Sequence, residues 1–427
     1  MDESLVRDYI ASYLKKEVPQ MIEREIKLEN MSGKATILVG PRRSGKTYLF
    51  WQEISKLKRN ETAYLDFEDI ALLGIKPQEV LYIIKQLFAE ISGSNAKAVF
   101  LDEVQNVEMW ESLVRTLLDR GYKVYVTGSS SKLLPKEIAT QLRGRSLTYL
   151  MLPFSFREFL KAKGFAELDL NAFDDLGKVK GLLKEYLEYG GYPEIVTNPH
   201  LKEKMLSEYR DLIFFKDFAE REKIRSIQVA KFIFSYVTQS FASEISYRRV
   251  LRYLSSSGIR FGKNTVYSYF KKLEETMVFF FLERYSVKVR MRSAWPKKVY
   301  LADNGLAYRI PYDMGRLMEN AVFLELKRIQ AEKPLQEIFY YKDQMDHEVD
   351  FLIKDGTKVT KLIQVTYASE RREIKDREIK SLIHASKQLK CTDLLVLTWD
   401  YGGEENLDGL TIKFVPLWKW FLKKSVR

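Results

Sequence analysis

Short apolar runs recur along the first part of the chain, and polar or turn-forming residues close each of them. Runs of about four to eight mostly apolar residues, separated by helix-compatible segments, are typical of strands in a parallel sheet. The pattern therefore predicts an α/β fold with a parallel sheet at its core. The runs lie at Thr36–Val39, Ala63–Asp69, Ala98–Leu101 and Lys123–Ser130.

The first run leads directly into a glycine-rich segment, G-x-x-x-x-G-K-T, which then opens a helix. In this strand–loop–helix context the motif forms a phosphate-binding loop. Gly40 and Gly45 let backbone N–H groups wrap a phosphate at the positive end of a helix. We expect Lys46 to reach the β- and γ-phosphates and the Thr47 hydroxyl to hold magnesium. The expected ATP-binding residues of the loop are Gly40, Pro41, Arg42, Arg43, Ser44, Gly45, Lys46 and Thr47.

An acidic pair, Asp102-Glu103, ends the third run. An aspartate at a strand end can hold magnesium through water, and the adjacent glutamate can polarise the attacking water. ATP hydrolysis needs this division of roles. The loop and the acidic pair together predict an ATPase that uses ATP and Mg²⁺, with Lys46 and Glu103 as catalytic residues and Thr47 and Asp102 as metal-binding residues.

Two further features near this site each have two interpretations. The fourth run ends in small hydroxyl residues, so Ser129 or Ser130 would take a sensor position near the γ-phosphate, or would only form a strand-end turn. Arg143 and Arg145 lie just beyond. Either would serve as an arginine finger supplied to a neighbouring subunit of a homo-oligomer, or would form a surface salt bridge.

The strand order, with an extra strand between the loop and the acidic pair, resembles the AAA+ and related additional-strand ATPases. Three phrases narrow the resemblance: LRGR (142–145), LPFSFREFL (152–160) and YLEYGGYPEIV (186–196). They resemble archaeal and bacterial ATPases that join an AAA-type core to a DUF4143 C-terminal region. The resemblance implies an ATP-binding core, a small helical lid, a winged helix and a nuclease-like C-terminal fold. Gly190 and Gly191 are interpreted as loop residues that supply positive φ, without a chemical role.

We place the boundaries of these four parts partly by charge. The net charge is +12, and residues 226–312 hold 15 Lys/Arg against 5 Asp/Glu. Such a basic block, interleaved with aromatic residues, favours a nucleic-acid partner over a merely solvated face. The expected domains are a P-loop core at 1–155, a helical lid at 156–225, a winged helix-turn-helix at 226–312 and a restriction-endonuclease-like α/β domain at 313–427.

The basic block has the pattern of a winged helix-turn-helix. Helices are expected at Val229–Ser240, at Tyr247–Ser255 and at Thr265–Leu273, the last capped by Asn264. Strands are expected at Val278–Tyr285 and Lys297–Leu301, with a basic wing between them whose alternation places its charges on one face. A rigid spacer or a protein-docking module is the alternative to DNA binding. The expected DNA-binding residues are Lys263, Thr265, Tyr267, Ser268, Lys271 and Lys272 on the helix, and Lys288, Arg290, Arg292, Lys297 and Lys298 on the wing.

The C-terminal part resembles the PD-(D/E)xK nuclease core, in which a helix glutamate, a strand aspartate and a Glu-x-Lys bind metal and activate water. Glu319 and Asp350 match the first two elements, but Gln364 and Thr366 stand where Glu and Lys are expected. An amide is a poor metal ligand, and threonine cannot supply the positive charge of lysine. Lys361 lies at odd spacing on the same strand, so it is a poor substitute. A degenerate domain is therefore expected, with nuclease activity as the alternative.

The remaining composition excludes several classes of protein. One cysteine, Cys391, excludes a disulfide scaffold and fits a reducing cytosol. The longest strongly apolar stretch, Met277–Leu282, is too short to span a bilayer, and the first residues lack a signal-peptide pattern. The three histidines, His200, His347 and His384, look too scattered for a zinc site, and His347 is expected at a surface or strand edge. A cytoplasmic protein without a membrane partner is expected.

The sequence thus predicts an ATPase that couples its ATP state to DNA binding through a basic winged helix. Two alternatives remain open. One is a nucleotide-regulated scaffold or regulator with negligible turnover, and the other is an ATP-dependent nuclease acting on branched DNA. The sequence identifies no protein partner.

Overall fold

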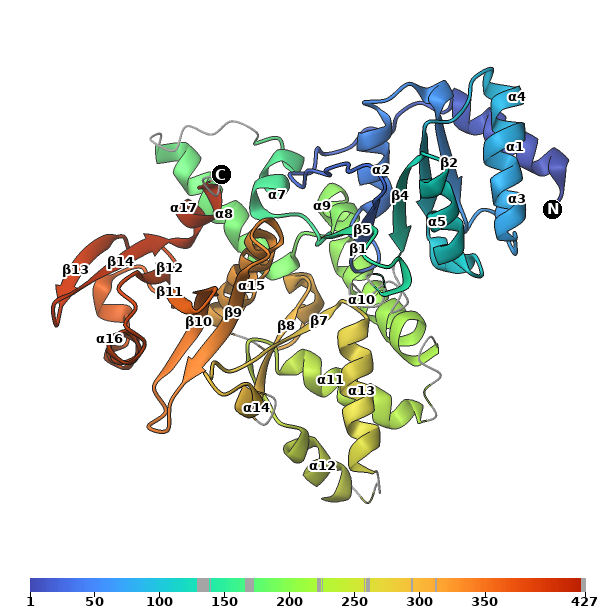
Figure 1. The fold of residues 1–427 in the computed structure, drawn as a ribbon. Coiled ribbons are helices and arrows are strands. Elements are labelled where there is room, and N and C mark those ends of the chain that lie inside the picture. Colours follow the sequence, from blue (N-terminus) through green and yellow to red (C-terminus); the bar gives the residue numbers. More distant parts are fainter. Residues whose placement is uncertain are drawn as a thin grey trace. The chain divides into compact units, whose positions relative to one another are not determined.

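The computed structural model describes residues 1–128, 138, 140–165, 173–220, 224, 226–256, 258, 262–292, 295–311 and 313–423. The chain divides into two compact units, Met1–Leu152 and Pro153–Arg427. Figure 1 gives the element labels used below. Of the helices in these described ranges, none is long and apolar enough to cross a membrane.

The first unit is built on a five-stranded parallel sheet in the order β2-β3-β4-β1-β5 (Figure 1). Four of these strands fall on the four apolar runs of the sequence. The fifth, β5, was not predicted, because its residues alternate at a half-buried edge rather than forming an apolar run. The strands are β1 (Ala35–Val39), β2 (Thr62–Asp66), β3 (Ala98–Asp102), β4 (Lys123–Gly128) and β5 (Ser146–Leu150).

Aromatic packing holds one of the helices of this unit, α2, on the sheet. The rings of Phe100 on β3 and Tyr125 on β4 stack with centroids 4.1 Å apart, and Phe50 on α2 packs edge-on against Phe100 at 5.0 Å. All three side chains are buried. The helices are α1 (Glu3–Lys15), α2 (Lys46–Ile54), α3 (Pro77–Tyr82), α4 (Phe88–Ser92) and α5 (Trp110–Asp119).

The second unit begins with helices over the range expected for a lid. Ser155 caps α7 in a capping box with Glu158, so this helix begins directly after the expected boundary at residue 155. The helices are α7 (Phe156–Ala162), α8 (Phe173–Tyr189), α9 (Pro193–Thr197) and α10 (Lys202–Leu212).

Three helices and a small antiparallel sheet, in the order β6-β8-β7, follow. They include the three helices and the two strands that the sequence predicts for this part of the chain. Two predicted details are wrong. The last helix is capped by Gly262 rather than Asn264, and the alternating basic segment forms a short helix, α14, instead of a strand. The elements are α11 (Ile227–Gln239), β6 (Ser243–Ile245), α12 (Tyr247–Ser256), α13 (Lys263–Glu275), β7 (Phe279–Leu282), α14 (Val289–Arg292) and β8 (Lys297–Leu301).

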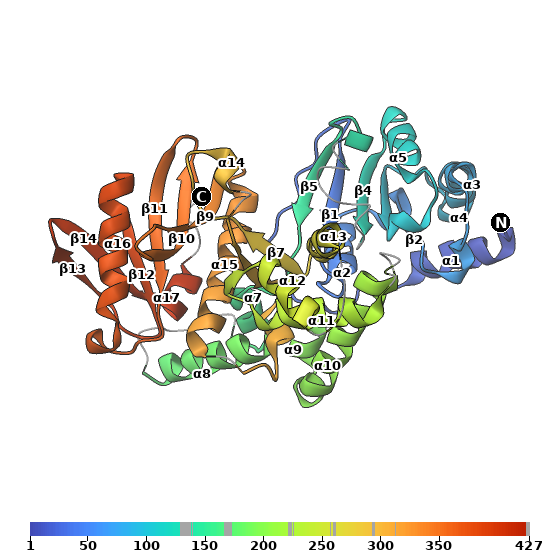
Figure 2. The same ribbon diagram turned by 90° about the horizontal axis from the view of Figure 1, so that it is seen from below.

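A six-stranded mixed sheet, in the order β13-β14-β12-β11-β10-β9, forms the C-terminal part. The helix α16 runs along this sheet, and its Ile379, Leu382 and Ala385 join the core under it (Figure 2). The elements are α15 (Met314–Glu332), β9 (Gln336–Lys342), β10 (Glu348–Asp355), β11 (Lys358–Val365), α16 (Asp376–Leu389), β12 (Leu394–Thr398), β13 (Gly403–Leu407), β14 (Leu410–Pro416) and α17 (Leu417–Leu422).

Candidate functional site

The glycine-rich loop lies at the carboxyl edge of the parallel sheet, between β1 and α2. Gly40 has φ 154°, and a Cβ atom there would lie 2.1 Å from the carbonyl oxygen of Met151, so only glycine fits. Gly45 has φ 94° and is the N-cap of α2. Both glycines are therefore required by the backbone path, and the loop leads into the positive end of a helix.

Lys46 turns back into this loop. Its ammonium donates to the carbonyl oxygens of Gly40 and Pro41, at 3.1 and 2.9 Å, and its side chain is buried. The hydroxyl of Ser44 is also buried and has no hydrogen-bond partner among the described residues. A buried hydroxyl without a partner costs free energy unless a ligand supplies one.

Arg24 braces the loop from a segment that the sequence did not single out. Its guanidinium donates to the carbonyl oxygens of Ser44 and Leu152, at 2.8 and 2.7 Å. Its backbone N–H donates to the side chain of Gln52 on α2. Arg24 lies in a segment without regular secondary structure, where no motif marks it, so only the folded contacts identify it as a positioning residue.

Asp102 ends β3 inside the sheet and is almost fully buried. Tyr64 donates to its Oδ2 at 3.0 Å, and the Thr127 hydroxyl at the end of β4 donates to Oδ1. Burial raises the pKa of Asp102, while hydrogen bonds from Thr127 and Thr47 oppose the increase. A nearby divalent cation would favour the ionised form in the same way.

Glu103 follows with φ 50° and so leaves the line of β3. Its backbone N–H donates to the Thr127 hydroxyl at 3.1 Å, and its carboxylate accepts from Gln105 at 2.5 Å. Beside β2, Glu68 lies 3.8 Å from Arg42 of the loop. Burial raises the pKa of Glu68, and the charge of Glu103 adds to the increase.

These residues fit a nucleotide with its magnesium ion. The loop has a glycine cradle that a Cβ would fill, an orphaned buried hydroxyl and a lysine within it. Thr47 and Asp102, the two expected metal-binding residues, share a hydrogen bond. Oxygen ligands of this kind suit Mg²⁺, which is usually held by one or two protein groups, phosphates and water.

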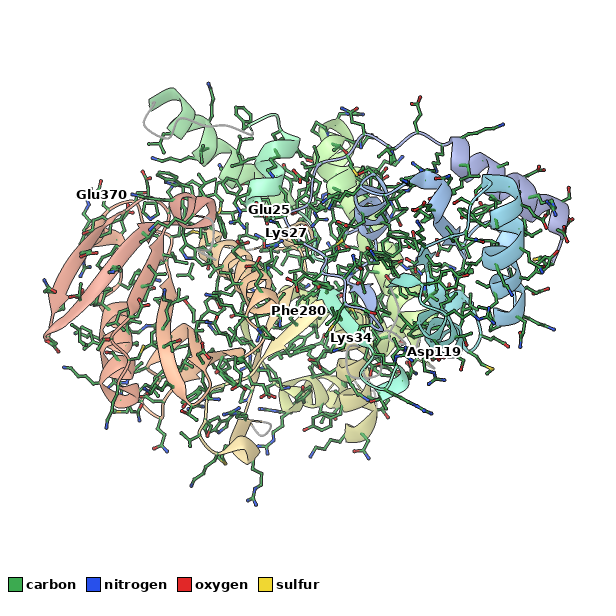
Figure 3. The ribbon with its side chains drawn as sticks, turned by 45° about the horizontal axis from the view of Figure 1, so that its top comes forward. Glu25, Lys27, Lys34, Asp119, Phe280 and Glu370 are labelled. Carbon is green, nitrogen blue, oxygen red and sulfur yellow. The ribbon has the colours of Figure 1, made fainter. Side chains whose placement is uncertain are left out.

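The expected sensor, Ser129 or Ser130, lies outside the described residues, and the nearest described hydroxyl of β4 is Thr127. Arg145 pairs with Asp119 at 2.7 Å and donates to the carbonyl oxygen of Gly33 at 3.1 Å; Asp119 is labelled in Figure 3. Arg143 is exposed and has φ 51°. Arg145 thus makes the surface salt bridge that was its alternative role.

Three family models match the chain in succession. An AAA domain matches residues 32–160, a domain of unknown function, DUF8612, matches 180–313, and another, DUF4143, matches 314–420. An uncharacterized protein of Methanocaldococcus jannaschii is 35% identical over 413 residues, which are 94% of this chain and 91% of that protein. The chain belongs to this family of AAA–DUF4143 proteins.

Other similarities are more distant. An uncharacterized protein of Haemophilus influenzae is 27% identical, over 90% of this chain and 93% of its own length. DnaA from Aquifex aeolicus, bound to AMPPCP, covers 64% of this chain and 86% of its own at 12% identity and a TM-score of 0.26. Cdc6p from Pyrobaculum aerophilum covers 75% and 98% at 11% identity and a TM-score of 0.27. At such TM-scores the likeness tells nothing about what the AAA–DUF4143 protein binds.

In the second unit, the expected DNA-facing residues of α13 are mostly exposed. Lys263, Tyr267 and Lys271 follow one another at intervals of four residues, so they share one face of the helix. Thr265 and Lys272 are half-buried, and Ser268 is exposed. The sequence analysis predicted the helix α12 but named no DNA contact on it, and the structure places three exposed arginines there: Arg248, Arg249 and Arg252.

The expected wing residues are less uniform. Lys288 and Arg290 are exposed. Arg292 instead donates to the carbonyl oxygen of Ser286 at 2.7 Å and packs over the ring of Phe339 at 4.7 Å. Lys297 pairs with Glu283 at 3.2 Å. The prediction that these residues form one basic face is therefore wrong, because the segment winds into α14.

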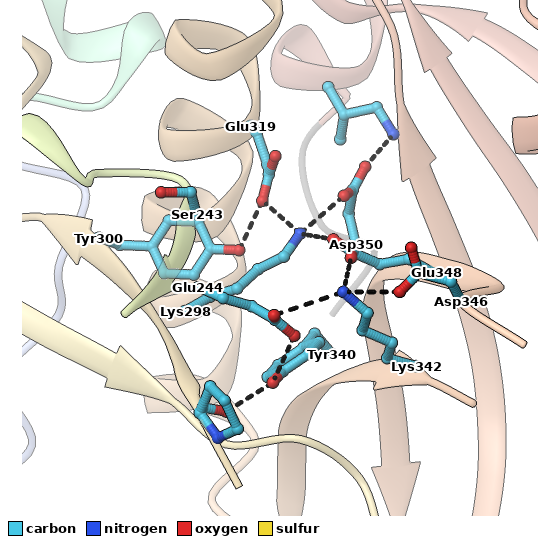
Figure 4. Close-up of polar contacts among 12 residues, drawn as sticks. Ser243, Glu244, Lys298, Tyr300, Glu319, Tyr340, Lys342, Asp346, Glu348 and Asp350 are labelled. Carbon is cyan, nitrogen blue, oxygen red and sulfur yellow. Dashed lines mark hydrogen bonds and ion pairs between the residues drawn. The ribbon is translucent and has the colours of Figure 1, made fainter. Parts of the chain in front are cut away.

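Lys298 departs furthest from its predicted role. Its side chain is 3% exposed, and its ammonium lies 3.0 Å from Glu319, 2.9 Å from Asp350 and 2.8 Å from Glu348 (Figure 4). Its pKa is raised well above the ordinary value: burial acts to lower it, but the neighbouring carboxylates, Asp350 first, outweigh burial. A buried lysine cannot face DNA, so this predicted DNA contact is wrong.

The cluster around Lys298 contains the residues expected from the nuclease-like pattern. Lys298 brings to Glu319 and Asp350 the positive charge that Thr366 cannot supply, but from β8 rather than from the last strand of the pattern. Lys361 pairs with Asp393 at 3.1 Å instead. A cavity of about 460 Å³ adjoins the cluster, lined in part by Glu348 and Gln364.

Finally, two of the histidines are not scattered in the fold. Asp343, His347 and His384 present ligand atoms within 4.8 Å of one another, the single such group of His, Cys, Asp and Glu in the described part of the chain. The statement that the histidines are too scattered is wrong for this pair, because β10 and α16 bring together residues 37 positions apart. His200 lies elsewhere, in the turn Pro199–Leu201.

Proposed function

We propose that the AAA–DUF4143 protein binds and hydrolyses ATP with Mg²⁺ and couples its ATP state to DNA binding. The observation that supports hydrolysis best is the meeting of the phosphate loop with the Asp102-Glu103 pair at one edge of the sheet. A switch that only bound nucleotide with its magnesium ion would need the loop and Asp102, but not a glutamate beside them to activate water.

In this proposal each residue has a separate task. The Lys46 ammonium, now on the loop's own carbonyl oxygens, turns to the β- and γ-phosphates. Thr47 and Asp102 would hold the metal, and magnesium would neutralise part of the phosphate charge. Glu103 orients the attacking water and takes its proton, and Thr127 fixes the Glu103 backbone.

ATP turnover by matched variants tests the proposal. Lys46→Ala should lose tight nucleotide binding, because it removes the cation that is buried within the phosphate loop. Glu103→Gln should still bind ATP but hydrolyse it about 100-fold to 1,000-fold more slowly, the usual cost of one such group. Glu108→Gln, a change at an exposed glutamate five residues further along, should behave as wild type.

The measurement is steady-state phosphate release with and without duplex, forked and single-stranded DNA, beside nucleotide binding by a fluorescent analogue. Wild-type turnover in Glu103→Gln would show that another residue orients the water. Nucleotide binding with negligible turnover in the wild type, under every DNA condition, would favour the scaffold or regulator.

The exposed residues of α12 and α13 support the DNA part of the proposal. Three arginines and two lysines are exposed on the two helices, and the exposed rings of Tyr253 and Tyr267 lie among them. The two helices contact each other through Tyr247, whose ring lies 4.6 Å from that of Tyr267. Clustered cations bind phosphates without reading sequence, so we propose DNA binding of low sequence preference.

We further propose that the C-terminal part does not cut DNA. Lys298 already neutralises the carboxylates that a metal would need, and Gln364 is a poor ligand. Agarose gels of supercoiled and four-way-junction DNA with magnesium or manganese check this point. Nicking that disappears in Asp350→Ala would instead support the nuclease.

A further inference from the structure

The structure assigns a transition-metal site to Asp343, His347 and His384, where we propose that a zinc-class divalent ion binds. The ligand atoms are Asp343 Oδ2, His347 Nδ1 and His384 Nε2. The first lies 2.8 Å from the second and 3.1 Å from the third. The two imidazole rings stack with centroids 4.4 Å apart, so both nitrogens face the same carboxylate oxygen.

These distances are close to those of a tetrahedral site. Zinc bonds to imidazole nitrogen and carboxylate oxygen are about 2.0–2.2 Å long, which separates two ligands of a tetrahedral ion by roughly 3.3–3.5 Å. The two nitrogens need to move away from Asp343 Oδ2 by about 0.2–0.7 Å to admit the ion. Each imidazole binds metal in its neutral form, with its proton on the other ring nitrogen, so the ion meets no cationic ligand.

The loop around Asp343 is already shaped for this role. Asp343 Oδ1 accepts hydrogen bonds from the backbone N–H groups of Met345 and His347, at 2.8 and 2.9 Å. These bonds fix the orientation of the carboxylate, so that its other oxygen, Oδ2, points toward the two imidazoles. Orientation of a ligand by such outer contacts is typical of metal sites.

A second contact holds α16 in register with this loop. Tyr341 hydrogen-bonds through its hydroxyl with the side chain of Gln388. Tyr341 and Asp343 are two residues apart at the end of β9, and His384 and Gln388 are one helical turn apart, so each pair shares a face. His384 is therefore placed opposite Asp343 by the packing of α16, before any ion binds.

The donor set indicates the class of ion. Two imidazoles and one carboxylate suit zinc, nickel or cobalt, whereas magnesium and calcium prefer oxygen ligands alone. The side chains are 12%, 28% and 37% exposed for Asp343, His347 and His384, so water can reach the fourth position. The ion would tie the β9–β10 connection to α16. This site is independent of the proposed ATPase.

The composition makes the test selective, because the chain contains only one further histidine and one cysteine, and that cysteine is buried. The full chain, stripped with a chelator and kept in excess magnesium to fill oxygen-only sites, is titrated with cobalt(II). Its visible absorption intensifies in a four-coordinate nitrogen site. We expect one cobalt ion per chain, displaced by zinc, and a rise in melting temperature with zinc.

His347→Ala and His384→Gln should each weaken binding by about 100-fold or more, since even outer contacts of metal sites contribute about 10–100-fold. His384→Gln retains an amide that can donate to Asp343, and its metal-free melting temperature shows that it is folded. His200→Ala is the matched control and should bind as wild type does. Absence of cobalt binding in the wild type, its loss in His200→Ala, or undiminished binding in folded His384→Gln would overturn the assignment.

Discussion

Several ionisable side chains in this chain are buried in tightly packed surroundings, and Asp303 is the clearest case. Its carboxylate accepts from the backbone N–H groups of Gly191 and Gly305, at 2.7 and 2.8 Å. Gly190 has the expected positive φ, 77°, but a Cβ there would also lie 1.7 Å from Asp303 Oδ1. The predicted positive φ is correct for Gly190 but wrong for Gly191, where a Cβ would instead lie 2.5 Å from the carbonyl oxygen of Phe154. The sequence pattern also gave no sign of the carboxylate that the loop encloses.

Asp303 should make stability depend on pH. Burial raises its pKa to about 7, against two opposing backbone hydrogen bonds. The folded chain therefore keeps a proton that the unfolded chain releases near pH 4. Its contribution to the free energy of unfolding is full below about pH 4 and is lost as the pH rises toward about 7, at up to about 1.4 kcal/mol per pH unit.

Urea unfolding at a series of pH values measures this slope. Asp303→Asn cannot ionise and should flatten it, whereas Asp313→Asn, at the exposed N-cap of α15, should leave it unchanged. Part of the slope should remain in Asp303→Asn, because burial also raises the pKa of Glu319 to about 7. An unaltered slope in Asp303→Asn would mean that the carboxyl stays ionised in the fold.

At the scale of elements, prediction succeeded where a motif and a strand end coincide. The phosphate loop and the acidic pair follow apolar strands, and parallel strands bring their carboxyl ends to one edge, so their meeting could be predicted. The prediction that residues 288–292 are extended was wrong, because an alternating pattern over five residues does not exclude a helical turn. Lys297 and Lys298 are neighbours on β8, and sequence alone cannot tell which one faces inward.

This difference between two adjacent lysines can be measured. Lys298→Met should lower the free energy of unfolding by about 3–5 kcal/mol, because it leaves carboxylates buried without their cation. Lys297→Met loses a partly exposed pair and should cost about 0–1 kcal/mol. Urea unfolding of both variants at pH 7 provides the comparison. Equal losses would mean that the carboxylates around Lys298 find water or protons at little cost.

For the molecule as a whole, excess charge is concentrated in one part, residues 226–312 with 15 Lys/Arg against 5 Asp/Glu. In the fold Lys298 is buried, so it adds no charge to the surface of this part, whereas the arginines of α12 are exposed. The composition thus predicts the region in which we propose a polyanion site. It could not predict the residues, because exposure is decided by how α12, α13 and α14 pack.

DNA affinity should therefore fall steeply with salt, and α12 should account for part of the slope. Each phosphate contact contributes about 0.9 to the log–log slope for duplex DNA. The triple variant Arg248→Ala/Arg249→Ala/Arg252→Ala should reduce the magnitude of this slope by about 0.9 for each phosphate contact that it removes. Lys358→Ala/Lys380→Ala/Lys390→Ala removes the same charge from exposed positions of the C-terminal part and should change the slope little.

Fluorescence anisotropy of a labelled duplex across a salt series gives both slopes. A companion triple variant, Lys288→Ala/Arg290→Ala/Arg292→Ala, measures the contribution of the basic segment before β8. Equal effects of the α12 and C-terminal variants would indicate attraction by net charge alone, without a defined DNA surface.

The burial of Lys298 among three carboxylates also determines where this chain can be divided into fragments or recombined with another chain. The two family models that cover the second unit meet between residues 313 and 314, yet the lysine belongs to one and its three carboxylates to the other. A fragment that ended at residue 313 would leave Lys298 without the three carboxylates that pair with it. A gene fusion that exchanged only residues 180–313 or only residues 314–420 would separate the lysine from its own carboxylates. We therefore expect these two regions to be inherited together, and they should be redesigned together.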